Sequence, residues 1–208
     1  MIQPNQNLYL NIIITCILWL FQENKLIAQN VKPLSKWAGI FEIGFAISEG
    51  EGTYGTSGLL QKTGVQRSFG KKDKLCLLSQ FSMASLSNKA TTDVRDAHYT
   101  HYQLSIATRY DILRFKAFSL FLKAGVFGLN SSGLLGSNAY QQSTPQRQTF
   151  FSEWHAGANA GLGIKIQPKN KHLGFLISPI DFGFGKNRFY FEHATLGLIF
   201  RINKKEKT

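Results

Sequence analysis

Large apolar residues alternate with small or polar ones along eight segments of this chain, and this alternation restricts the fold more than any other feature. In the clearest segment, 38–48, every second residue is large and apolar: Phe41, Ile43, Phe45 and Ile47. A period of two places successive side chains on opposite faces of a strand, which a helix does not do. Similar segments fall at about 56–69, 74–86, 98–110, 116–128, 150–167, 172–184 and 191–202. The sequence therefore predicts an all-β fold.

The connections between these segments alternate between short and long. The short ones are 70–73, 111–115 and 168–171, and the long ones are 49–55, 87–97, 129–149 and 185–190. An up-and-down barrel in a membrane has short turns on one rim and longer loops on the other. The spacing thus predicts an antiparallel up-and-down barrel of about eight strands, with both termini on the turn side.

The two faces of each segment differ in a way that separates a membrane barrel from a soluble one. One face is apolar, as in Leu75, Leu77, Phe81 and Met83, then Tyr102, Leu104, Ile106 and Tyr110, then Phe118, Leu120, Leu122 and Val126. The opposite face is rich in small residues such as Gly44, Ala46, Ser119, Gly157, Gly161 and Gly163. Only 17% of all residues are charged, whereas a soluble barrel loads its polar face with Lys and Glu. Small side chains suit the crowded lumen of a narrow barrel. The faces predict a transmembrane barrel and leave a soluble exported β protein as the alternative.

Aromatic residues lie near the ends of the predicted strands. They are Trp37, Phe69, Tyr99, Tyr110, Trp154, Tyr190, Phe191 and Phe200. Membrane barrels carry girdles of aromatic side chains at both interfaces with water. We expect such girdles here, with ordinary strand aromatics as the alternative for part of the set.

The first 29 residues differ in composition from the rest. Residues 8–21 are almost continuously apolar, which is the length of the apolar core of a secretory signal, and Ala28 precedes a plausible cleavage point. We expect a signal peptide at 1–29 and a barrel domain at 30–208, with a retained anchor as the alternative. Removal of the signal takes Cys16 with it and leaves Cys76 as a single thiol, so no intrachain disulfide is expected.

The formal net charge is +12, and all of it belongs to the predicted mature chain, because the charges of Glu23 and Lys25 cancel. An exported basic protein meets phosphate mainly as lipid headgroups or lipopolysaccharide. We expect outer-membrane lipid and lipopolysaccharide as partners, with plain surface solvation as the alternative. The basic residues are scattered, and no nucleic-acid-binding signature occurs, so no nucleic-acid partner is expected.

The last predicted strand carries a resemblance to known proteins. Residues 192–201 (EHATLGLIFR) resemble the final strand of outer-membrane barrels, in which a glycine and a terminal aromatic form the signal for the insertion machinery. With Ala28-Gln29 and the segment 177–185 (ISPIDFGFG), the chain resembles the generic outer-membrane β-barrel proteins of Bacteroidetes-type bacteria over roughly 36–202. The tail 202–208 departs from the pattern because it extends beyond the aromatic that is often terminal. The resemblance implies an outer-membrane location and assembly by the insertion machinery.

The sequence was searched for the groups that a lipid-modifying barrel enzyme would need. Residues 193–196 (HATL) are the nearest match to the His-x-Ser-Asn motif of lipid A deacylases, and they lack both the Ser and the Asn. Glu153 and His155 share a face, as an acid and a base on one strand do, or as fillers of a barrel interior. His98 and His101 are three apart and fall on opposite faces, so one strand cannot present both to a metal. Residues 157–163 match no phosphate loop because no helix follows. No catalytic, cofactor-binding or metal-binding residue is predicted.

The most favoured function is a non-enzymatic barrel whose external loops, above all 129–149, bind a surface ligand or whose body supports the envelope. The alternatives are a lipid A-modifying enzyme and a narrow transport pore. We also hypothesise that lumen-facing charges form a buried ionic network that closes the barrel, through Glu42, Arg109, Lys123, Glu153 and Lys165. Ligand and oligomeric state are not predicted.

Overall fold

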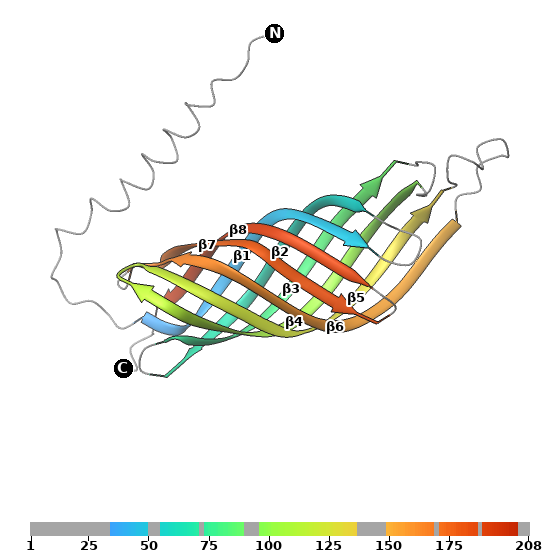
Figure 1. Ribbon diagram of the computed structural model, residues 1–208. Helices are drawn as coiled ribbons and strands as arrows, with labels where there is room; N and C mark the ends of the chain where they lie inside the picture. Colours follow the sequence, from blue (N-terminus) through green and yellow to red (C-terminus); the bar gives the residue numbers. More distant parts are fainter. Residues whose placement is uncertain are drawn as a thin grey trace, which may run out of the picture. The chain divides into compact units, whose positions relative to one another are not determined.

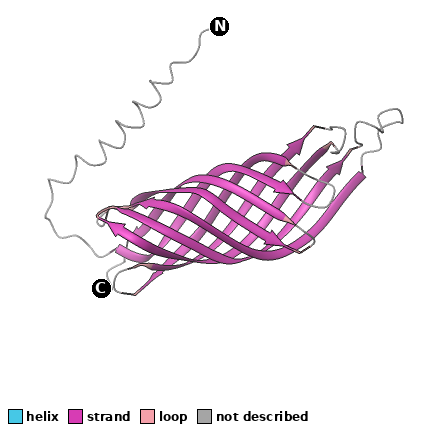
Figure 2. Cartoon of the chain, viewed as in Figure 1, coloured by secondary structure: helices cyan, strands magenta, loops and turns pink. Residues whose placement is uncertain are grey.

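The computed structural model describes residues 34–49, 55–70, 73–89, 96–136, 149–168, 171–186 and 189–203. Eight strands make up the fold: β1 (Leu34–Glu49), β2 (Thr56–Phe69), β3 (Leu75–Asn88), β4 (Ala97–Phe115), β5 (Phe118–Leu135), β6 (Thr149–Ile166), β7 (Leu173–Gly185) and β8 (Tyr190–Asn203). Each strand pairs with its neighbour in sequence, and β8 pairs with β1, so the sheet closes (Figure 1). Figure 2 shows the same barrel as strand throughout its wall.

Every pair in the wall is antiparallel, including the closing pair of β1 and β8. The predicted eight-stranded up-and-down barrel is therefore confirmed. Closure leaves no edge along most of the wall, which satisfies the backbone groups that lipid cannot. No helix in the described part of the chain is long and apolar enough to cross a membrane. The predicted signal peptide at 1–29 lies outside the described residues.

Two of the predicted connections are wrong in position. The turn expected at 111–115 is strand, because β4 runs to Phe115 and the chain reverses at Lys116 and Ala117. Lys116 adopts a φ of 51°, the left-handed conformation that a two-residue hairpin requires. The loop expected at 129–149 is also shorter, since β5 continues to Leu135 and β6 begins at Thr149. Residues 130–133 (NSSG) have turn-like composition, but pairing with both neighbours keeps them in the wall.

Burial alternates along the strands as the sequence predicts. The apolar rows named for β1, β3, β4 and β5 face outward, and most of their large side chains are 40–60% exposed. The small residues of the opposite rows face the lumen. An apolar exterior on a closed barrel is what a bilayer covers. A soluble barrel would carry its polar face outside, so the soluble alternative does not fit this exterior.

The aromatic girdle is confirmed only in part. Trp37, Phe69, Tyr110, Trp154 and Phe200 are exposed on the outer face near strand ends. The prediction is wrong for Tyr99 and Phe191, which are 3% and 2% exposed and point into the lumen. Position near the end of a strand does not decide which face a side chain lies on. That face is set by whether the residue is an even or an odd number of positions from the outward-facing residues of the strand.

Two irregularities shape the wall. The register of β7 shifts between Ser178 and Asp181, on either side of Pro179, where a proline interrupts the ladder at a bulge. In addition, β7 ends at Gly185 opposite Gly157, so the first residues of β6 pair only with β5. Strands β4 to β6 accordingly extend farther at the loop side, as Figure 1 shows.

Candidate functional site in the barrel lumen

Side chains fill the lumen in three layers, which follow one another from the turn side to the loop side of the barrel. The turn-side layer is an apolar cluster that includes Ile40, Leu78, Phe121, Leu176 and Ile199. The loop-side layer is a second apolar cluster that includes Leu60, Leu86, Phe127, Leu129, Phe189 and Phe191. Polar and charged residues occupy the middle. Since β1, β3, β5 and β8 each carry polar residues between their two apolar contributions, the polar layer is enclosed at both ends.

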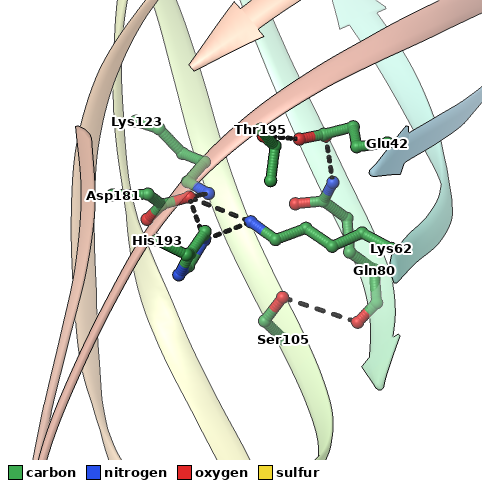
Figure 3. A network of polar contacts seen from close by, with 8 residues as sticks. All are labelled: Glu42, Lys62, Gln80, Ser105, Lys123, Asp181, His193 and Thr195. Atoms are coloured by element: carbon green, nitrogen blue, oxygen red, sulfur yellow. Dashed lines mark hydrogen bonds and ion pairs between the residues drawn. The ribbon is translucent and has the colours of Figure 1, made fainter. Parts of the chain in front are cut away.

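Asp181 on β7 is the centre of the middle layer (Figure 3). Its carboxylate Oδ2 accepts from Lys62 Nζ at 3.2 Å, from Lys123 Nζ, and lies 3.0 Å from His193 Nε2. The Lys62 ammonium also contacts the ring of His193. All four side chains are less than 10% exposed. One carboxylate thus holds cations from strands β2 and β5, which lie across the lumen from one another.

Glu42 on β1 lies beside this centre and is held by neutral groups. Its carboxylate accepts from Gln80 Nε2 at 2.8 Å and from Thr195 Oγ1 at 2.6 Å. Ser105 Oγ in turn donates to the carbonyl of Gln80 at 3.4 Å. Figure 3 shows these side chains converging from four strands on one level of the lumen. The result is a polar crosslink of the wall.

A second anion, Asp111 on β4, lies toward the turn side. Its Oδ2 accepts from Lys165 Nζ at 2.5 Å and from Arg114 at 2.6 Å. Arg109 on the same strand stacks over the ring of Phe121 at 5.1 Å and donates to Gln66 Oε1 at 2.7 Å. The guanidinium thus lies over an apolar ring, and with Lys165 and Arg114 it brings three cations to the neighbourhood of one carboxylate.

At the loop side a histidine joins two serines. His101 Nε2 lies 3.0 Å from Ser48 Oγ, and Nδ1 lies 2.8 Å from Ser131 Oγ. The His101 ring packs edge-on against Tyr99, Phe189 and Phe191. All three polar side chains are 1–3% exposed. A serine paired with a histidine has the chemistry of a nucleophile and base, but here no carboxylate of the described residues contacts the imidazole and the serines are covered. The arrangement is a hydrogen-bonded closure.

The hypothesised ionic network exists with different acids. Arg109, Lys123 and Lys165 lie in the lumen as expected. Glu42 forms no ion pair with any described residue, and the Glu153 side chain is 61% exposed. The acids that pair with the buried cations are Asp181 and Asp111, neither of which was expected in the network.

The remaining candidates from the sequence are histidines, Glu153 and Cys76, and they do not form one site. Glu153 and His155 do share a side, with 3.7 Å between Oε2 and Nε2, and His155 stacks on Phe189 at 4.4 Å. His98 faces outward and His101 inward, so the expectation of opposite faces is confirmed. Among the described residues no cluster of three or more His, Cys, Asp or Glu side chains is arranged to hold a metal. Cys76 is a buried free thiol that contacts Ser68.

Comparison with solved structures identifies the class of fold. The barrel is similar to Neisserial surface protein A, with a TM-score of 0.57, 10% identity, and coverage of 81% of this chain and 98% of that one. It is also similar to Ail, the attachment invasion locus protein of Yersinia pestis, with a TM-score of 0.50, 14% identity, and coverage of 81% and 100%. No protein-family model and no curated protein matches the sequence. The fold is that of small eight-stranded outer-membrane β-barrels, and the predicted outer-membrane location agrees with it.

Proposed function

We propose that this protein is a non-enzymatic outer-membrane barrel that anchors a binding surface on the cell exterior or supports the envelope. The observation that carries the proposal is the filled lumen. Three layers of packed side chains close the barrel, and the serine–histidine pair inside it is covered on all sides. Packing of this kind along the described lumen argues against a transport path through it.

The loop side is the part of the molecule that this function uses. Strands β4 to β6 extend there, and Phe150 and Trp154 are 68% and 79% exposed on β6. Lipid and lipopolysaccharide are the proposed surroundings of the wall, and the insertion machinery is the proposed partner during assembly. We also infer membership of the Bacteroidetes-type barrels from residues 192–201, and a cleaved signal peptide at 1–29 followed by the barrel domain 30–208, from composition.

Orientation is tested by thiol labelling in intact cells. In a Cys76→Ala background, Glu153→Cys on the loop side is expected to react with a membrane-impermeant maleimide on whole cells. Lys116→Cys, in the turn between β4 and β5, is the matched control and is expected to react only after permeabilisation. The reverse pattern would place the loop side in the periplasm and would contradict the proposal.

The absence of pore and enzyme activity is tested on the wild-type chain. We expect no conductance steps above baseline in planar bilayers and unchanged lipid A acylation in cells that express the barrel. Discrete conductance steps would favour the narrow pore. Altered lipid A that returns to normal with His101→Ala would favour the enzyme.

A further inference from the structure

The amide side chain of Gln61 faces outward and does not suit a lipid surrounding. Gln61 on β2 is exposed on the outer face and pairs with Ile43 on β1 and Met83 on β3. Ile43 lies near the middle of the outward row of β1, which runs from Trp37 to Ile47. Gln61 therefore lies within the apolar belt. It makes no hydrogen bond with any residue that the structure describes.

An unpaired amide in hydrocarbon is costly because lipid chains offer neither donors nor acceptors. Thr108 on the same surface avoids this cost by bonding to the backbone. Thr108, on the outer face of β4, donates to the carbonyl of Ala124 at 3.2 Å. Gln61 has no such partner, and it carries both a donor and an acceptor group. No described residue satisfies it, and a second molecule beside this surface would.

A groove with a volume of about 550 Å³ adjoins Gln61 on the outer wall. It crosses β7, β8, β1 and β2, and its lining is almost entirely apolar. Its walls include Ile43, Phe45, Leu59, Gln61, Pro179 and Leu196, and its floor includes Ala194. The small side chain of Ala194 and the bulge at Pro179 leave the hollow. Leu59, on its rim, is 75% exposed, more than any other aliphatic side chain of the described wall.

We propose that this wall is the interface of a homodimer within the membrane. A two-fold axis along the membrane normal, passing beside Gln61, brings the amides of two copies together. Each amide then donates to and accepts from the other, which an isologous contact requires. Leu59 lies two residues from Gln61 on the same strand and lines the same groove, so the protruding Leu59 of each copy is part of the contact. A hydrogen-bonding group, a projection and a hollow thus all lie within the proposed interface.

The amide distinguishes a second copy from a lipid. An acyl chain fills an apolar groove, but it leaves both polar groups of Gln61 unsatisfied. A second copy supplies a donor and an acceptor at the same depth in the bilayer, because both barrels have the same orientation. Gln61 therefore favours a second copy over a lipid acyl chain as the occupant of the groove. The apolar groove alone would accept either one.

Crosslinking in native outer membranes tests the contact. In a Cys76→Ala background, Gln61→Cys is expected to form a disulfide-linked dimer on mild oxidation, with a yield at least fivefold above that of Leu122→Cys. Leu122 is an outward residue of β5 at the middle of its apolar row, on the opposite side of the barrel, and serves as the matched control. Equal yields from the two positions would overturn the proposal.

Association in lipid bilayers tests the two elements of the interface separately. Gln61→Leu retains the size of the side chain and removes the amide pair, and we expect it to weaken dimerisation roughly tenfold, as for two hydrogen bonds between membrane segments. Ala194→Phe fills the groove and is expected to weaken dimerisation at least as much. Ala160→Phe, an outward alanine on β6, is the control and should leave the dimer unchanged.

Each variant is first shown to be folded by its gel mobility before and after boiling, so that loss of dimer is not loss of fold. The proposal is overturned if the wild-type chain is monomeric at every ratio of protein to lipid. It is also overturned if the chain retains bound lipid and Gln61→Leu does not change dimerisation. A dimer that both variants weaken and the control does not supports it.

Discussion

Asp181 is the residue on which the interior charges depend. It pairs with Lys62 and Lys123, and both ammonium groups are buried. Asp181→Asn removes the anion and leaves two buried ammonium groups without the carboxylate that they contact. Loss of one partner of a buried ion pair typically costs about 3–5 kcal/mol. We expect a loss of this size in the free energy of unfolding, measured by urea titration of the barrel in lipid vesicles.

Glu153→Gln provides the comparison for this experiment. Glu153 was also expected in the interior network, but its side chain is 61% exposed and touches only His155 among the described residues. Its replacement should change the free energy of unfolding by less than about 0.5 kcal/mol. If both variants unfold at the same urea concentration as wild type, the buried charge cluster contributes no stability.

The sequence did not predict Asp181 as the central acid of the lumen because β7 contains a bulge. Counting by twos from Gly174 and Leu176, which face inward, places Asp181 on the outer face. The bulge around Pro179 inserts one residue and reverses the parity, so Asp181, Gly183 and Gly185 face the lumen. A proline inside an alternating segment is the signal that a bulge was present. The partners on β2 and β5 depend on registers around the whole barrel, which alternation does not encode.

At the scale of strands, the closing pair of β1 and β8 depends on a close approach at Gly44. A Cβ atom added there would overlap the carbonyl oxygen of Ala194 and the backbone of Thr195. Because these are backbone atoms, the strands would have to separate. We expect Gly44→Ala to destabilise the barrel by about 1–3 kcal/mol. The measurement is the urea midpoint in vesicles, together with the fraction of unboiled protein that migrates as folded barrel.

Gly39 lies on the same strand and gives a matched control. A Cβ atom added at Gly39 meets nothing within 4 Å. Gly39→Ala should therefore change stability by less than about 1 kcal/mol, with a small gain from reduced freedom of the unfolded chain. Equal destabilisation by the two alanines would show that the approach of β8 to Gly44 is not tight.

Strand positions and faces were predictable because alternation is a local property. The outward rows of β3 and β4 agree with the sequence residue by residue. Strand ends were less predictable. Asp111 was assigned to a turn, yet it lies in β4 and pairs with Phe121, and residues 130–133 remain paired despite their turn-like composition. Pairing with two neighbours in a closed wall outweighs local preference at these positions.

At the scale of the whole molecule, the two ends of the apolar belt set the depth of the barrel in the bilayer. Trp37 lies at the turn side, and its ring contacts the guanidinium of Arg67 at 5.4 Å. Trp154 lies at the loop side and is 79% exposed. Tryptophan rings favour the interface, and an exposed arginine favours the level of the headgroups. The belt between them is then the hydrocarbon-spanning part.

Tryptophan fluorescence in vesicles of brominated lipid measures this depth directly. In the chain from residue 30 onward, Trp154→Phe leaves Trp37 as the reporter, and Trp37→Phe leaves Trp154. We expect lipids brominated near the glycerol to quench both reporters more than lipids brominated near the chain ends, because each ring lies at an interface. Stronger quenching of Trp154 by lipids brominated near the chain ends would mean that Trp154 lies in the hydrocarbon core. The part of β6 that pairs only with β5 would then begin within the membrane. No quenching of Trp154 by either lipid would mean that the extension of β6 rises into water, where it is available to an external ligand.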